Sequence, residues 1–132
     1  MRHLRISLLV LLFVSLPVSL LAAAPTGAGS FFVKAPGSER EIPISNATFK
    51  DQVYFRVHVH ANDGDHAMQI TIYDGSGREV CNAESTLFVK DGTGVDITSY
   101  GFSSKRDASG TWWYVAAVDG KVVASESLNV GR

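Results

Sequence analysis

The segment from Val53 to Ala61 constrains the fold of this chain more than any other. Apolar side chains occupy its odd-numbered positions, and polar or amphipathic side chains occupy the even-numbered ones. Successive side chains of a β-strand point to opposite faces, so this pattern predicts a strand with one buried face and one exposed face. The segment from Met68 to Tyr73 repeats the alternation after a turn cluster at residues 62–65. Both segments therefore predict half-buried strands of a sheet.

Turn signals recur along the rest of the chain every 8 to 12 residues or so, which is the spacing of an all-β sandwich or barrel. No stretch after residue 25 shows sustained helical periodicity. Further strands are predicted at residues 31–34, 79–83, 87–89, 95–102, 111–118 and 122–130. We therefore predict one all-β domain over residues 31–132, a sandwich of seven to eight antiparallel strands, preceded by a flexible lead-in at residues 25–30.

The first 24 residues have the pattern of a secretory signal peptide. A basic start, with Arg2 and Arg5, precedes an apolar run from Ile6 to Leu16 and a small-residue segment from Pro17 to Ala24. The alternative is a retained membrane-spanning helix, because the segment approaches the ~20 apolar residues that cross a bilayer. We expect export, a periplasmic or secreted location, and no membrane insertion after the signal peptide is cleaved.

Charge and cysteine content narrow the class of protein. Removing Arg2 and Arg5 from the 12 basic residues leaves 10 against 13 acidic residues, a net charge of −3 without long charged runs. This balance argues against a nucleic-acid partner. The single cysteine, Cys81, excludes an intrachain disulfide, which favours a bacterial envelope protein over an animal secreted module. We interpret Cys81 as a small packed side chain.

The C-terminal segment resembles a known class of module. It begins with Gly110-Thr111-Trp112-Trp113, alternates to Val118, turns at Asp119-Gly120 and returns through a second alternating strand that includes Leu128 and Val130. This run resembles the final hairpin of immunoglobulin-like or fibronectin-type-III-like modules of bacterial cell-envelope proteins. The resemblance covers about the last twenty residues closely. It implies an immunoglobulin-like β-sandwich and a non-catalytic binding or structural role.

Three histidines form a candidate metal site. His58 and His60 project from one face of the predicted strand, about 7 Å apart. If the next strand returns as a hairpin neighbour, His66 joins them with the carboxylates of Asp63 and Asp65, a set suited to Zn²⁺ or Cu²⁺. Alternatively, His58 and His60 are solvent-facing residues of an ordinary strand, and a change of sheet between the two strands moves His66 away.

Trp113 is the leading candidate for partner binding. Neighbouring strand residues face opposite ways, so Trp112 is predicted to enter the core and Trp113 to lie on the outer sheet face with Val115 and Ala117. An outward tryptophan can anchor a protein or a sugar ring, unless a loop such as Asp91–Gly94 or 105–109 covers it. Tyr54 and Arg56, on the polar face of the strand from Val53, are further candidates.

The sequence carries no catalytic signature. It lacks a Gly-x-Ser-x-Gly elbow and a phosphate-binding glycine loop before a helix. We therefore expect a protein that is not an enzyme, holds no cofactor, and contacts an envelope protein or glycan through an outer sheet face or an edge strand. The alternative is a periplasmic zinc- or copper-binding protein.

Overall fold

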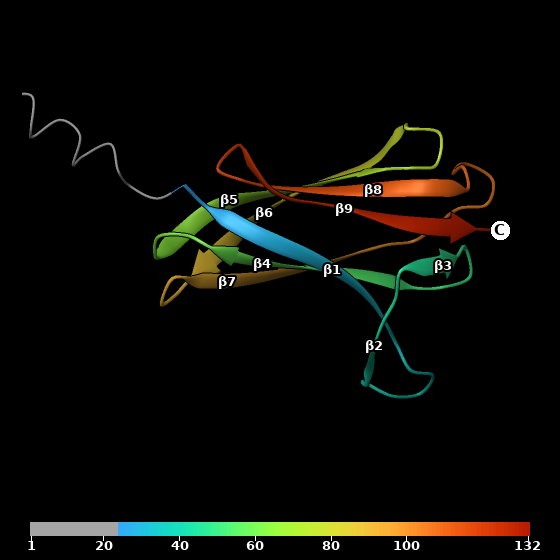
Figure 1. The fold of residues 1–132 in the computed structure, drawn as a ribbon, viewed down its shortest axis with the longest axis horizontal. Helices are drawn as coiled ribbons and strands as arrows, with labels where there is room; N and C mark the ends of the chain where they lie inside the picture. The colour runs from blue at the N-terminus through green and yellow to red at the C-terminus, as the bar shows by residue number, and fades with distance from the viewer. Residues whose placement is uncertain (1–23) are drawn as a thin grey trace, which may run out of the picture.

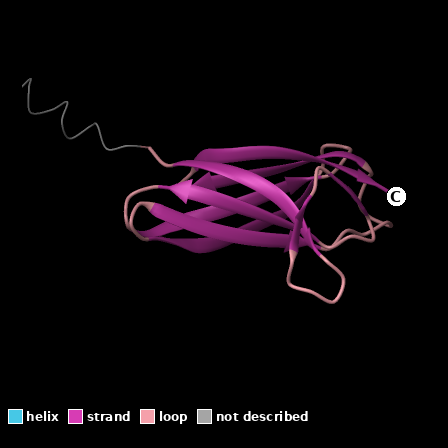
Figure 2. Cartoon of the chain, turned by 60° about the horizontal axis from the view of Figure 1, so that its bottom comes forward, coloured by secondary structure: helices cyan, strands magenta, loops and turns pink. Residues whose placement is uncertain are grey.

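The computed structural model describes residues 24–132, and the predicted signal peptide at residues 1–24 lies outside them apart from Ala24. This part of the chain consists of strands and loops (Figure 2). No helix long and apolar enough to cross a membrane occurs among these residues. The strands are β1 (Thr26–Lys34), β2 (Glu41–Pro43), β3 (Asn46–Thr48), β4 (Val53–His60), β5 (Gly64–Tyr73), β6 (Glu79–Val89), β7 (Thr93–Tyr100), β8 (Gly110–Val118) and β9 (Lys121–Gly131).

The nine strands form two sheets that pack face to face (Figure 1). One sheet has the order β2-β1-β4-β7, and the other has the order β3-β9-β8-β5-β6. The predicted all-β sandwich is confirmed. The predicted seven to eight antiparallel strands were too few, because the three-residue strands β2 and β3 add to the edges and β3 pairs with β9 in parallel.

The core consists of the inward-facing residues of both sheets. Val53, Phe55, Val57 and Val59 of β4 are fully buried, as the alternation of this segment predicts. They face a second row from the other sheet, formed by Met68, Ile70, Ile72, Trp112, Tyr114, Ala116 and Val118. The buried indole of Trp112 also donates a hydrogen bond of 2.8 Å to the carbonyl oxygen of Ala108. Cys81 is partly buried against this core, where burial raises the pKa of its thiol.

The predicted flexible lead-in is wrong, because residues 26–30 belong to β1 and pair with β4. The glycines in this segment serve a close approach between strands. A side chain at Gly29 would place its Cβ 2.6 Å from the ring of Phe55, and one at Gly27 would come within 2.9 Å of the His58 carbonyl oxygen. Glycine is therefore required by packing at these positions, where its frequency had suggested flexibility.

The C-terminal hairpin agrees with its prediction. β8 pairs with β9 through the two-residue turn Asp119-Gly120, and both turn residues have positive φ, 50° and 80°. Positive φ at both central residues is the geometry of a type I′ turn, which matches the twist of the flanking strands and favours Asp-Gly. This hairpin holds Trp112 and Trp113 in the centre of the five-stranded sheet.

Candidate functional site

Trp113 lies on the outer face of the five-stranded sheet, with 46% of its surface exposed. No loop covers it among the described residues, so the prediction of an outward tryptophan is confirmed. It pairs across the sheet with Tyr73 of β5 on one side and Ser127 of β9 on the other. Tyr73 is half-buried. A large amphipathic ring is thus presented to solvent from two rigid neighbouring strands.

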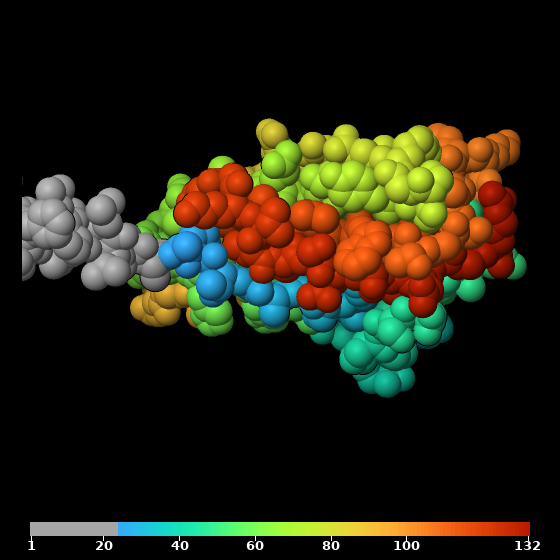
Figure 3. All heavy atoms as spheres, turned by 45° about the horizontal axis from the view of Figure 1, so that its top comes forward, coloured from blue at the N-terminus to red at the C-terminus, as the bar shows by residue number. Residues whose placement is uncertain are grey.

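The rest of this outer face carries mainly polar side chains. We call the outer face of the five-stranded sheet the Trp113 face. Figure 3 shows the molecule from the side of this sheet, with β9 in red and β8 in orange. Next to Trp113 along β8 are the half-buried Val115 and Ala117. The pairing registers place several polar residues around them, namely Thr71, Gln69, Asn82, Glu84 and Ser125. Gln69 Nε2 donates to Asn82 Oδ1 at 3.0 Å, beside a shallow hollow of about 230 Å³ that reaches Glu84 and Ala117.

Tyr54 and Arg56 lie on the outer face of the other sheet, on β4. Arg56 forms a two-pronged ion pair with Glu41 of β2, with N···O distances of 2.9 and 2.5 Å, and its guanidinium lies 4.5 Å from the centre of the Phe32 ring. Tyr54 stacks on Phe32 at 5.1 Å between ring centres. The hydrogen bond from Arg56 lowers the pKa of Glu41. Both candidates are thus occupied by contacts within their own sheet.

The three predicted partner-binding residues therefore do not lie on one surface. Trp113 belongs to the five-stranded sheet, whereas Tyr54 and Arg56 belong to the four-stranded sheet, and each points away from the core. Alternation correctly identified all three as outward-facing, but it carries no information about which sheet a strand joins. Their separation leaves Trp113 as the centre of the candidate site.

The three predicted metal-ligating histidines do not come together. His58 and His60 lie on β4 in the four-stranded sheet, and His66 lies on β5 in the five-stranded sheet. Within residues 24–132 no group of three histidine, cysteine or acidic side chains is placed to hold a metal ion. Asp63, a predicted oxygen ligand, instead accepts a hydrogen bond of 2.8 Å from the N–H of Gly92. The physical reason is that the chain changes sheet between β4 and β5.

His66 has a different role, because it connects two loops at one end of the sandwich. Its Nδ1 lies 2.6 Å from Asp119 Oδ2 in the β8–β9 turn, and its Nε2 lies 2.6 Å from the carbonyl oxygen of Asn62. Both partners are acceptors, so the doubly protonated ring satisfies both contacts at once. The bond to Asp119, followed by the bond to Asn62, raises the pKa of His66. The protonated ring therefore stabilises this end of the fold.

We expect the contribution of His66 to stability to depend on pH. A raised folded-state pKa gives stability that is fully present below the ordinary value of 6.5 and is lost as pH rises through the folded-state pKa. Urea unfolding of the wild type and of His66→Gln should therefore differ more at pH 5.5 than at pH 9. His58→Gln, on the exposed face of β4, is the matched histidine-to-glutamine control. A difference that grows with pH would contradict this role.

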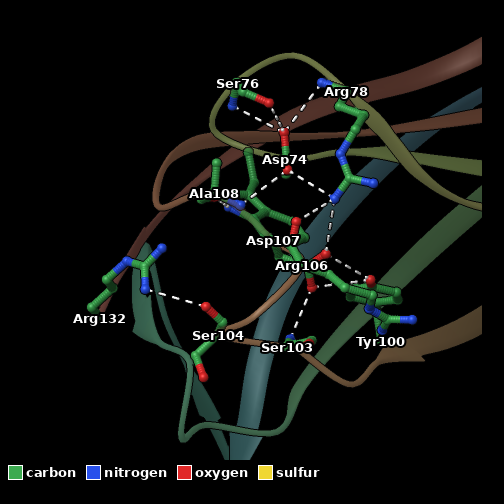
Figure 4. A network of polar contacts seen from close by, with 11 residues as sticks. Asp74, Ser76, Arg78, Tyr100, Ser103, Ser104, Arg106, Asp107, Ala108 and Arg132 are labelled. Atoms are coloured by element: carbon green, nitrogen blue, oxygen red, sulfur yellow. Dashed lines mark hydrogen bonds and ion pairs between the residues drawn. The ribbon is translucent and has the colours of Figure 1, made fainter.

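The most buried polar cluster lies at the opposite end of the sandwich (Figure 4). Asp74 follows β5 directly, and Asp107 lies in the loop between β7 and β8; their exposed fractions are 1% and 3%. One guanidinium nitrogen of Arg78 lies 3.5 Å from a carboxylate oxygen of each. The hydroxyl of Tyr100 donates to Asp107 at 3.1 Å. The cluster joins the β5–β6 turn to the β7–β8 loop.

Backbone N–H groups supply most of the remaining donors to these carboxylates. Asp74 accepts from the N–H groups of Ser76, Arg78 and Ala108, and Asp107 accepts from that of Ser103. Burial alone would raise the pKa of Asp74, but these bonds and that from the Ser76 hydroxyl outweigh it and lower the pKa to about 2. The sequence suggested only a turn at Asp74-Gly75-Ser76-Gly77. The β7–β8 loop that completes the cluster comes later in the chain, and no residue pattern near Asp74 indicates that the two loops meet.

Comparison with solved structures identifies the fold. An immunoglobulin-like protein from Pseudomonas aeruginosa superposes with a TM-score of 0.53 at 14% sequence identity, over 83% of this chain and 98% of that one. The fold is immunoglobulin-like. A segment of a β-glucosidase from Listeria innocua superposes with a TM-score of 0.54 at 11% identity, over 83% of this chain and 16% of the enzyme.

A CARDB domain from Pyrococcus furiosus has a TM-score of 0.49 at 15% identity, over 83% of this chain and 90% of the domain. Comparison with protein families finds no match to the chain. Comparison with curated proteins also finds no match. In this immunoglobulin-like domain, the contacts of His66 connect loops at one end and those of the buried Asp74 and Asp107 connect loops at the other, whereas the exposed tryptophan lies on a sheet between them. The candidate site is therefore the Trp113 face.

Proposed function

We propose that this protein is an exported, non-catalytic binding module of the bacterial envelope that binds glycan through the Trp113 face. The observation that carries the proposal is the exposed indole of Trp113, held beside Tyr73 on two rigid strands. The basic and apolar leader at residues 1–24 supports export, and the single cysteine supports a bacterial source.

The composition of the Trp113 face favours a glycan over a protein partner. Protein interfaces have a well-packed apolar centre from which charged residues are depleted. Here the exposed indole has hydroxyl groups beside it, from Ser127 on β9 and Thr71 on β5. The other exposed apolar side chains of this face, Phe88 and Val122, pair with Asp65 and Ala117 further along the sheet and do not form an apolar centre with it. A sugar ring offers an apolar face that can stack on an indole, and hydroxyl groups that need such partners. The face is also shallow, which suits a chain of sugars lying across the strands.

The contacts of the buried carboxylates support a non-catalytic role. Asp74 and Asp107 are the buried acidic side chains in the described part of the chain, and both are occupied by backbone N–H groups and Arg78. Donors that bind a carboxylate in this way direct it at its own loop, and those around Asp74 also lower its pKa. Neither carboxylate faces the Trp113 face. The fold also occurs as a segment covering 16% of a β-glucosidase, which is consistent with an accessory module.

Co-sedimentation tests this proposal directly. Protein purified after export should pellet with peptidoglycan sacculi, and insoluble cellulose and chitin serve as comparison glycans. Trp113→Ala should weaken the binding at least about tenfold, as expected for a central aromatic anchor, and Trp113→Phe should retain part of it. The control is His58→Ala, which truncates an exposed side chain on the outer face of the other sheet.

Two results would overturn the glycan assignment. One is a wild-type protein that remains in the supernatant with all three glycans. The other is wild-type binding that Trp113→Ala leaves unchanged although the variant unfolds at the same urea concentration. Capture of an envelope protein that depends on Trp113, without glycan binding, would assign the face to a protein partner instead.

A further inference from the structure

The two lateral sides of the sandwich end in strands of very different length. On one side, the three-residue strands β2 and β3 cover the outer edges of β1 and β9. On the other side, the sheets end in the eight-residue strand β7 and the eleven-residue strand β6. A long edge strand presents a row of backbone donors and acceptors that can pair with another strand. The side that ends in β6 and β7 is thus the more open to such pairing.

The direction of the free backbone groups of β7 follows from the turn before it. Thr93 exchanges two hydrogen bonds with Lys90, at 3.0 and 3.2 Å, so its N–H and C=O point away from β4. Backbone groups of a strand alternate in direction with a period of two residues. Val95, Ile97 and Ser99 therefore also direct their N–H and C=O groups outward. In the described part of the chain, β7 pairs with β4 and, at Thr93, with Lys90, and these pairings leave the outward groups of Val95, Ile97 and Ser99 free.

The side chains of β7 also favour pairing with another strand. Val95 and Ile97 lie on the outer face of the sheet with exposed fractions of 50% and 49%. β7 contains no lysine, no proline and no register shift in its pairing with β4, which are features that protect edge strands. The one charged residue is Asp96, which points to the inner side and accepts a hydrogen bond of 3.4 Å from Thr98.

We propose that β7 pairs antiparallel with β7 of a second copy of this chain, about a two-fold axis at Ile97. This register pairs Ile97 with Ile97 and Val95 with Ser99, so all the outward backbone groups of these residues are used in both copies. It also places Asp96 opposite Thr98. The two four-stranded sheets become one continuous sheet of eight strands.

Charge and existing hydrogen bonds exclude the registers centred closer to the start of the strand, and an axis at Thr98 would leave Val95 opposite Gly101, beyond the end of β7. An axis at Asp96 would place two carboxylates directly opposite each other, which is destabilising. An axis at Val95 would require the backbone of Thr93, which Lys90 already occupies. The edge is thus complementary to itself in the Ile97 register, which is the requirement for a two-fold dimer. This complementarity favours a second copy over an unrelated strand.

Analytical ultracentrifugation of the purified protein tests the dimer. We expect the wild type to sediment as a dimer at 100 μM, and Ile97→Lys, which places two ammonium groups on the axis, to dimerise at least about tenfold more weakly. The control, Val122→Lys, alters a residue that is 64% exposed on the other sheet and should remain dimeric. A monomeric wild type at 100 μM would overturn the proposal, as would an Ile97→Lys variant that dimerises like the wild type.

Disulfide trapping tests the register independently of any effect of lysine on folding. In a Cys81→Ser background, Ile97→Cys should form an intermolecular disulfide under mild oxidation, because paired Cα atoms in this register lie about 5.5 Å apart. Val95→Cys should not crosslink to itself, since the two copies of residue 95 are about 13 Å apart along the strands. Equal crosslinking at both positions would exclude the Ile97 register. Neither experiment depends on the glycan proposal.

Discussion

Replacing Gly75 with alanine is expected to destabilise the protein by about 3 kcal/mol or more, as an overpacked site that cannot relax. A Cβ at this position would lie 1.9 Å from the carbonyl oxygen of Ser109, and 2.8 Å from the backbone nitrogen of Gly110. These are backbone atoms, so no side-chain rotation can remove the clash. The β5–β6 turn would have to move away from the β7–β8 loop and lose the hydrogen bond of 3.1 Å from Gly75 N–H to the Ala108 carbonyl.

Gly77 provides the matched control in the same turn. Its φ is +83°, and a Cβ there would meet no atom within 4 Å. Gly77→Ala should therefore cost only the strain of a left-handed conformation, about 1 kcal/mol. Urea unfolding followed by tryptophan fluorescence measures both free energies. Equal losses in the two variants would show that the clash at Gly75 is relieved and that the two loops are not packed as described.

The strands that could be predicted are those whose evidence is local. The alternation from Val53 to Ala61 reports burial on one face regardless of what the strand packs against, and Asp119-Gly120 determines a hairpin from two residues. The same reasoning correctly assigned Trp112 to the core and Trp113 to the surface. The sandwich followed from the spacing of the turn signals, because few layered arrangements accommodate such strands, and its immunoglobulin-like type followed from the resemblance of the C-terminal hairpin.

The features that could not be predicted depend on contacts between distant residues. The three-residue strands β2 and β3 are too short to show a period. The glycines at 27 and 29 suggested flexibility, because the ring of Phe55 that requires Gly29 lies on another strand.

In the candidate site, the exposure of single residues could be predicted from local patterns, but which residues lie together could not. A short turn after β4 suggests a hairpin, but the chain crosses to the other sheet, and this change separates His66 from His58. Alternation identifies the face of each strand without identifying its sheet. Trp113 could therefore be predicted as an exposed residue, whereas its separation from Arg56 could not.

Asp74→Ala is expected to destabilise the protein by about 3 to 5 kcal/mol at pH 7, the range seen when one member of a buried charged group is removed. The substitution leaves the N–H groups of Ser76, Arg78 and Ala108 without their acceptor, at the point where two loops pack together. Each buried donor left without a partner costs about 1 to 3 kcal/mol. Asp74→Asn should lose less, because its amide oxygen can still accept the bonds made to Asp74 Oδ1.

The pH dependence of this loss separates the carboxylate from mere packing. The folded-state pKa of Asp74 is lowered from 3.8 to about 2, so the charged form contributes stability that is present above pH 3.8 and is lost as pH falls toward 2. That contribution is on the order of 2 kcal/mol. The difference in unfolding free energy between the wild type and Asp74→Asn should therefore shrink over this interval. A difference that stays constant from pH 5 to pH 2 would show that the ionised carboxylate does not hold the two loops together.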